Sequence, residues 1–133
     1  MIKTLRLFAV LGALSVAIGA FGAHGLEKMV AEEALVTFRT GVRYQFYHVF
    51  ALGGTGLLYL LPGHRSAWLS RAAWAFGLGI LFFCGSLYLL TLRDFHPVPV
   101  AMLGPITPLG GLFFLFGWVA IFLALPRKSP VHD

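Results

Sequence analysis

Residues 72–92 read AAWAFGLGILFFCGSLYLLTL, a run of 21 residues without a charged side chain. About 20 apolar residues in a helix are needed to cross the ~30 Å of hydrocarbon in a bilayer, so this stretch predicts a transmembrane helix. Similar apolar runs cover residues 5–23, 46–61 and 108–125. The run at 46–61 is short, and we take its helix to begin near residue 44, where polar side chains enter the membrane edge.

The composition explains why these runs need a membrane. Of the 133 residues, 59% are hydrophobic and 11% are charged, whereas soluble domains carry about 25% charged residues. So few charges leave too much apolar surface for water, and lipid must be the solvent. We therefore expect an all-α membrane protein. It forms a single membrane domain over residues 1–133, with a bundle of four transmembrane helices at about residues 5–23, 44–61, 72–92 and 108–125.

The segment between the first two helices is not a plain loop. Its apolar side chains recur at near-helical spacing, with charged residues between them. The apolar residues are Leu26, Met29, Val30, Ala34, Phe38 and Val42. This pattern is typical of an amphipathic helix that lies in the membrane interface, and we place that interfacial helix at about residues 26–43. The alternative is that this segment runs on into the second transmembrane helix, with Gly41 as a weak point.

Prolines mark the ends of two helices. Pro62-Gly63 predicts a stop after the second helix. Thr107 followed by Pro108 is a helix-start signal, in which a hydroxyl cap precedes a proline at the first helical position. We therefore start the fourth helix at residue 108, and we expect the apolar residues 98–103 to dip into the interface without crossing.

The first apolar run has a second interpretation. It follows basic residues and ends in Ala20-Phe21-Gly22-Ala23, which resembles a signal peptide with a small-residue cleavage site. We favour a retained helix because the run is long for a signal peptide and its removal would leave an unfilled bundle. Ser15, Gly19 and Ala23 fall four residues apart and form a small-residue stripe suited to packing on another helix.

Lysine and arginine decide the orientation, since cytoplasmic loops carry an excess of them. One side of the predicted bundle has Lys3, Arg6, Arg65, Arg71, Arg127 and Lys128. The other has Lys28, Arg39, Arg43 and Arg93, accompanied by four of the five acidic residues. The excess predicts that both termini face the cytoplasm. The net charge of +5 does not indicate a nucleic-acid partner, because the basic residues flank apolar runs and form no patch with interleaved aromatics.

Polar side chains that adjoin hydrocarbon are costly and are therefore candidate functional residues. The primary candidates for ligand binding are His24, Arg43, Tyr44, Gln45 and His48, which we expect to meet at the outer interface as a site for an anionic or hydrogen-bonding head group. The alternative is a structural network of helix caps and interhelical bonds. The secondary candidates are Ser86, Tyr88 and Thr107.

The sequence gives no reason to expect an enzyme. It contains no phosphate-binding loop, no nucleophile elbow and no His-Glu-x-x-His motif. We expect no metal site and no cofactor, because His24 and His48 lack nearby carboxylate or thiolate partners in sequence. The single cysteine, Cys84, lies in an apolar run and is expected to be a small core residue. Active transport is disfavoured, because the four runs contain no acidic residue.

Four stretches resemble a known family. They are residues 19–26 (GAFGAHGL), 37–48 (TFRTGVRYQFYH), 85–92 (GSLYLLTL) and 104–112 (GPITPLGGL). Together, in this order, they are similar to the domain of unknown function 423 family, the small YgdD- and YwdK-like membrane proteins of bacteria, whose animal relatives are described only as a transmembrane protein. The resemblance implies a multi-pass protein of the bacterial plasma (inner) membrane and supplies no activity, substrate or cofactor.

We weigh three functions. The first is a non-enzymatic membrane protein that binds membrane lipids or a partner membrane protein, with a homo-oligomer as one form of partnership. The second is a passive channel or facilitator for a small solute. The third is a redox or enzyme subunit that uses His24 and His48. The first is favoured because the polar residues cluster at one end of the predicted helices and do not line a full helix face.

Overall fold

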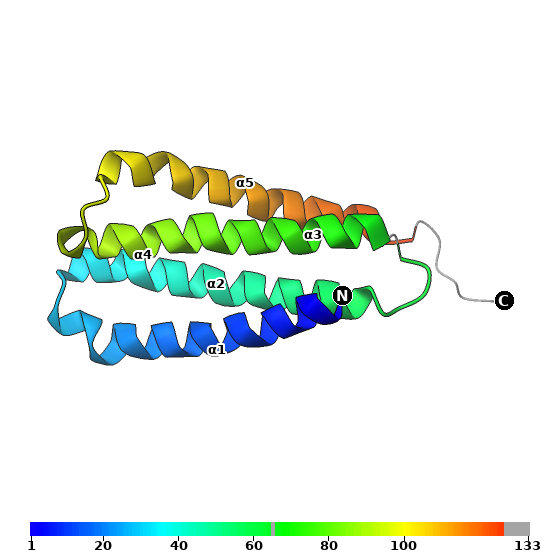
Figure 1. The fold of residues 1–133 in the computed structure, drawn as a ribbon, viewed down its shortest axis with the longest axis horizontal. Helices are drawn as coiled ribbons and strands as arrows, with labels where there is room; N and C mark the ends of the chain where they lie inside the picture. Colours follow the sequence, from blue (N-terminus) through cyan, green and yellow to red (C-terminus); the bar gives the residue numbers. More distant parts are fainter. Residues whose placement is uncertain (65, 127–133) are drawn as a thin grey trace.

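The structure is a computed structural model that describes residues 1–64 and 66–126. Within these ranges it is helical and contains no strand. The elements are α1 (Ile2–His24), η1 (Leu26–Lys28), α2 (Glu32–Leu58), α3 (Ser66–Gly79), the π-helical turn η2 (Ile80–Cys84), α4 (Gly85–Thr91), η3 (Arg93–Phe95) and α5 (Val100–Ala124). The segments α3, η2 and α4 follow one another without a break and form one long helical rod. This rod lies beside α2 and α5, α1 lies beside α2, and successive long helices are antiparallel (Figure 1).

Three helical segments of the described chain are long and apolar enough to cross a membrane: Ile2–Lys28, Ala67–Thr91 and Val100–Ala124. The predictions of an all-α fold and of several apolar membrane helices are confirmed. Helix α2 is as long, with 27 residues, but it does not meet the same criterion. Its first turns carry Glu32, Glu33, Arg39 and Arg43.

A separate interfacial helix over residues 26–43 is not formed. The three-residue η1 is followed by α2, which begins at Glu32 and continues without interruption past Gly41 to Leu58. The alternative, in which the segment runs on into the second helix, describes the structure. No proline interrupts residues 32–58, and Gly41 is a contact point, because a Cβ there would lie 2.8 Å from the ring of Tyr88.

The predicted start of the fourth helix at Thr107-Pro108 is also wrong. Helix α5 begins at Val100, after Pro99 in an extended conformation, and both Pro105 and Pro108 lie inside it. Prolines are tolerated inside membrane helices because hydroxyl side chains, neighbouring helices and local adjustments satisfy the freed backbone groups. Of the segment expected to dip into the interface, residues 98–99 precede α5 and residues 100–103 form its first turn. The predicted stop at Pro62-Gly63 fits a turn, in which Gly63 has a φ of +84°.

Helices α1 and α2 pack through complementary side-chain sizes. Toward the end of α1 where the chain turns into η1, its small residues face larger ones of α2: Gly22 opposes Phe38, and Gly19 opposes Val42. Toward the other end the sizes are reversed, because Phe8 of α1 lies on Gly53 of α2. Close contact of this kind drives helix association in lipid, where no hydrophobic effect acts between helices. The predicted stripe is confirmed at Ser15 and Gly19, while Ala23 is exposed.

Helix α5 packs in the same way on the rod formed by α3, η2 and α4. Gly117 lies against Phe76, and Gly79 lies against Phe114. A Cβ on Gly110 would overlap the backbone of Phe83. The tightly packed pairs are thus α1 with α2, and α5 with the rod. Helix α2 also contacts the rod and so joins the two pairs.

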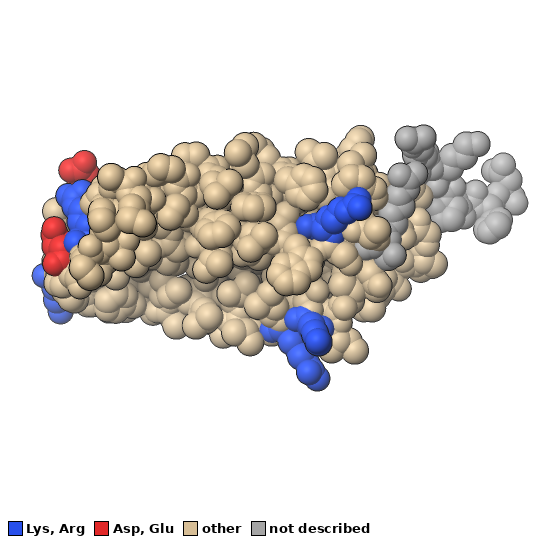
Figure 2. Space-filling model, turned by 45° about the horizontal axis from the view of Figure 1, so that its top comes forward, with Lys and Arg blue, Asp and Glu red and all other residues tan. Residues whose placement is uncertain are grey.

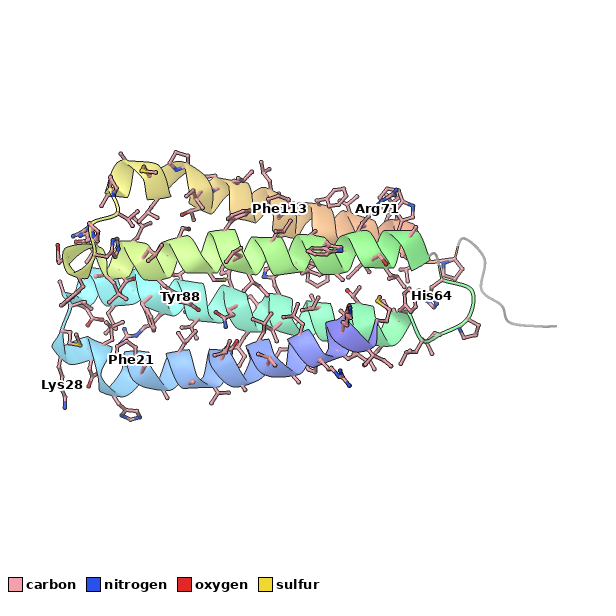
Figure 3. The ribbon with its side chains drawn as sticks, in the orientation of Figure 1. Phe21, Lys28, His64, Arg71, Tyr88 and Phe113 are labelled. Atoms are coloured by element: carbon pink, nitrogen blue, oxygen red, sulfur yellow. The ribbon has the colours of Figure 1, made fainter. Side chains whose placement is uncertain are left out.

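The charges lie at the two ends of the bundle. Glu27, Glu32, Glu33 and Asp94 gather with basic residues at the end formed by residues 24–33 and 92–99, which we call the mixed-charge end (Figure 2). Lys28 lies at this end and Arg71 at the opposite, basic end (Figure 3). The predicted separation of charges is therefore present, although Arg65, Arg127 and Lys128 lie outside the described residues.

Candidate functional site

The five primary candidates do not share one site. His24 is exposed at the end of α1, and Arg43 is exposed on α2. Gln45 is buried toward α1 and α4, whereas Tyr44 and His48 line a cavity between α2 and α5. Successive residues of a helix point about 100° apart, so a polar run in sequence is distributed over several faces.

Gln45 joins three helices through its amide. Its Nε2 donates to Ser15 Oγ on α1 at 2.9 Å, and its Oε1 accepts from the hydroxyl of Tyr88 on α4 at 2.6 Å. The Ser15 hydroxyl donates onward to the carbonyl of Leu11 at 2.7 Å. Figure 3 places Tyr88 between α4 and α2. Ser15 and Gln45 are 0% and 3% exposed, so this network is buried and its polar groups satisfy one another.

The other two secondary candidates also pair with each other. Ser86 Oγ lies 2.6 Å from Thr107 Oγ1 and 2.9 Å from the carbonyl of Phe83. A hydroxyl has one proton to donate. When Ser86 donates its proton to the Phe83 carbonyl, its Oγ accepts a hydrogen bond from the Thr107 hydroxyl. Thr107 therefore links α5 to α4 instead of capping α5.

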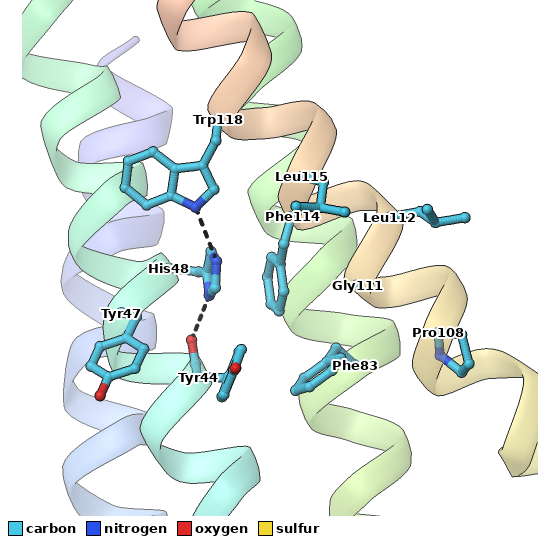
Figure 4. Close-up of a pocket in the computed structure, with 10 residues that line it drawn as sticks. All are labelled: Tyr44, Tyr47, His48, Phe83, Pro108, Gly111, Leu112, Phe114, Leu115 and Trp118. Atoms are coloured by element: carbon cyan, nitrogen blue, oxygen red, sulfur yellow. Dashed lines mark hydrogen bonds between the residues drawn. The ribbon is translucent and has the colours of Figure 1, made fainter.

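His48 sits in an aromatic site between α2 and α5. Its ring stacks on Phe114, with ring centroids 3.4 Å apart and planes at 7°. Trp118 Nε1 donates to His48 Nε2 at 3.3 Å, and His48 Nδ1 lies 2.8 Å from the Tyr44 carbonyl (Figure 4). Because Nε2 accepts, Nδ1 must carry the proton and donate to that carbonyl. Both ring nitrogens are therefore engaged, and the imidazole is neutral in this arrangement.

The cavity beside His48 has a volume of about 590 Å³. We call it the α2–α5 cavity. Its lining residues are Tyr44, Tyr47, His48, Phe83, Pro108, Gly111, Leu112, Phe114, Leu115 and Trp118. Most of these are apolar or aromatic, and the tyrosines contribute hydroxyl groups. The π-helical turn η2 contributes Phe83, and π-helical turns occur often at functional sites.

Arg43 lines a second, smaller pocket of about 290 Å³ between α1 and α2, which we call the arginine pocket. Gly19, Gly22, Ala23, Phe38 and Val42 line it together with the charged residues Glu27, Arg39 and Arg43. Arg39 is paired with Glu32 at 3.0 Å. Within residues 1–64 and 66–126, Arg43 has no carboxylate within ion-pair distance.

The sequence did not single out several residues that line the α2–α5 cavity. Trp118 and Phe114 lie in the apolar run at 108–125, where nothing distinguishes a cavity-lining ring from a lipid-facing one. A signal was present for Trp118, because tryptophan in membrane helices prefers the interfaces and this one lies well inside a helix. The spacing of four residues between Tyr44 and His48 does place both on one helix face.

Cys84 and the candidate histidines His24 and His48 lie on separate helical elements. No group of three or more His, Cys, Asp or Glu side chains comes together in the part of the chain that the structure describes. Cys84 is 0% exposed and packs in the core cluster with Phe76 and Phe114. His24 and His48 lie on different helices and at different depths, since His24 ends α1 and His48 lies near the middle of α2.

Comparison with known proteins identifies the family. A model of the family described as "Protein of unknown function (DUF423)" matches residues 18–111. The chain belongs to the DUF423 family. The resemblance drawn from the four sequence stretches is thus confirmed, and the matched residues include the arginine pocket, Gln45, Tyr88 and His48, whereas Ser15 precedes the matched range.

Relatives extend the match beyond that range. The UPF0382 membrane protein SH2409 of Staphylococcus haemolyticus is 40% identical over 126 residues, covering 90% of this chain and 95% of the relative. The UPF0382 membrane protein YwdK of Bacillus subtilis is 39% identical over 125 residues, covering 90% and 96%. A Haemophilus influenzae relative is 39% identical over 119 residues, covering 90% of each chain. No solved structure matches significantly. This DUF423 chain is therefore an integral membrane protein, and the relatives' names state no activity.

Proposed function

We propose that this DUF423 protein crosses the bacterial plasma membrane four times and binds an anionic membrane lipid, without catalysis, through the arginine pocket. The observation that carries the proposal is Arg43, an arginine without an ion-pair partner among the described residues, placed beside a hollow with glycines in its wall. A guanidinium presents its donors in a planar fork that matches a phosphate.

The position of Arg43 on α2 suits a lipid head group. Side chains of a helix lean toward its N-terminus, and the N-terminus of α2 lies at the mixed-charge end. Arg39 and Arg43 lie on the same face, four residues apart, and both can extend toward the head-group level. This also explains how α2 could cross: its uncharged part, residues 44–58, is about 22 Å long, and the arginines beyond it reach the membrane surface.

The proposed orientation puts the basic end and both termini in the cytoplasm. Lys3, Arg6 and Arg71 lie at that end without acidic neighbours among the described residues, whereas the basic residues at the other end are mixed with acids. The channel alternative has less support, because the buried polar groups of Ser15, Gln45 and Tyr88 bond to one another. The redox alternative has less support because His24 and His48 are apart.

The experiment is native mass spectrometry of protein purified in mild detergent. We expect the unaltered chain to retain an anionic phospholipid and Arg43→Gln to lose most of it while keeping its melting temperature. Arg93→Gln is the matched control, because Arg93 is an exposed arginine at the same end that does not line the pocket. Equal lipid retention in both variants would contradict lipid binding by Arg43. Loss of folding in Arg43→Gln, with no lipid on the unaltered chain, would make Arg43 a structural residue.

A further inference from the structure

The α2–α5 cavity is not used by the binding proposed for Arg43. Its volume of about 590 Å³ falls in the ~300–1,000 Å³ range of small-molecule sites. It lies at hydrocarbon depth, since it is lined by Tyr44 to His48 at the middle of α2 and by Pro108 to Trp118 on α5. An occupant must therefore arrive through the membrane and be mainly apolar.

One face of α2 connects this cavity with the arginine pocket. Tyr47 follows Arg43 by four residues, so the two side chains are neighbours on the helix surface. Arg43 lines the arginine pocket and Tyr47 lines the α2–α5 cavity. Both side chains are exposed, and Tyr47 is 56% exposed. A molecule held by its phosphate at Arg43 can extend inward over Tyr47 and reach the cavity.

We infer that the two places bind one ligand, a phospholipid whose phosphate lies at Arg43 and one of whose acyl chains occupies the α2–α5 cavity. The inference rests on the proposed function and specifies its ligand as a phospholipid with acyl chains rather than a free phosphate ion. The charge of Arg43 selects the anionic end, and the rings of Phe83, Phe114 and Trp118 supply the apolar wall.

The head group and the acyl chain contribute to the binding free energy in different ways. An acyl chain in the bilayer is already in hydrocarbon, so its entry into the cavity gains packing contacts and not a hydrophobic transfer free energy. The head group gains charge-assisted hydrogen bonds. The head group therefore decides the affinity, and the cavity decides which chains fit.

A glycine in the cavity wall allows a direct test. A Cβ on Gly111 would meet only one atom within 4 Å, in the ring of Phe83 at 3.9 Å, so a side chain there grows into the cavity. Gly104 lies on the same helix, and a Cβ there would meet nothing within 4 Å. Gly111→Phe fills the cavity, and Gly104→Phe makes the same chemical change outside it.

The readout is the fluorescence of Trp118 in the background W68F/W74F, with the protein in detergent and phosphatidylglycerol carrying brominated acyl chains as the quencher. We expect saturable quenching in this background and in Gly104→Phe, and at least a twofold smaller saturable component in Gly111→Phe. Arg43→Gln tests the head-group end separately, by the preference for phosphatidylglycerol over phosphatidylcholine with the same chains.

The outcomes separate the two proposals. Quenching that does not saturate, or that is unchanged by Gly111→Phe, overturns the acyl-chain site even if Arg43→Gln abolishes the lipid preference. Loss of quenching in Gly111→Phe without any effect of Arg43→Gln supports a chain site and overturns both the role of Arg43 and the single ligand that spans it.

Discussion

The side-chain amide of Gln45 on α2 donates to the hydroxyl of Ser15 on α1 at 2.9 Å, in a position where both residues are almost fully buried. The same amide accepts from Tyr88, so a single residue ties α1 and α4 to α2. We expect Gln45→Leu to lower the free energy of unfolding by ~1–3 kcal/mol, because two interhelical bonds are lost and the Tyr88 hydroxyl is left without its partner.

Thermal unfolding in detergent measures this loss. Phe50→Leu is the control, since Phe50 lies on the same helix and is 65% exposed. If Gln45→Leu melts at the same temperature as Phe50→Leu, the network does not hold the helices together.

Gly110 and Gly111 are adjacent and should respond oppositely to alanine. A methyl group on Gly110 would overlap the backbone of Phe83, which cannot move aside as a side-chain tip can. We expect Gly110→Ala to lose ~1–3 kcal/mol of stability by overpacking. Gly111→Ala should be neutral or slightly stabilising, because the space is open and alanine favours a helix. Melting curves of the two variants test the packing of α5, and similar curves would contradict the close contact at Gly110.

Trp118 is expected to stabilise the aromatic site through its N–H group. Trp118→Phe keeps a ring but removes the donor to His48 Nε2, and we expect a loss of ~0.5–1.5 kcal/mol. Trp74→Phe makes the same change at a residue that is 75% exposed and should leave the melting temperature unchanged. The bond is unimportant if the two variants melt alike.

The crossing of α2 is tested by labelling single cysteines from the two sides of the membrane. In a Cys84→Ser background, Glu33→Cys should react with an impermeant reagent added outside, and Ser66→Cys should react only after permeabilisation. Glu33 and Ser66 flank the uncharged part of α2, so four crossings place them on opposite sides. Labelling of both from the same side would show that α2 does not cross.

Hydropathy is sufficient to find the apolar helices, because a long uncharged run is stable only where lipid or a large protein core surrounds it. It fails at α2, where the charged residues suggest a separate interfacial element. A helix backbone continues through charges when neither proline nor a turn interrupts it, so residues 32–58 form one helix. The helix-start signal at Thr107-Pro108 fails at α5, because Pro105 and Pro108 would end a helix in water but lie inside this one.

The site is only partly predictable. A spacing of four residues puts Tyr44 and His48 on one face, as a property of a single helix. The pairs Gln45–Tyr88 and Ser86–Thr107 join different helices across 43 and 21 residues of sequence, and no local pattern encodes such a contact. The expected meeting of His24, Arg43, Gln45 and His48 is wrong because it uses their nearness in depth and ignores their different directions around the helices.

Binding of an anionic lipid by Arg43 is tested most directly by titrating delipidated protein with phosphatidylglycerol and comparing the unaltered chain with Arg43→Lys and Arg43→Gln. We expect at least ~10-fold weaker binding for Arg43→Gln, which corresponds to ~1.4 kcal/mol. Arg43→Lys should be intermediate, because lysine keeps the charge and loses the planar fork. Equal dissociation constants for all three proteins would show that Arg43 does not bind the lipid head group.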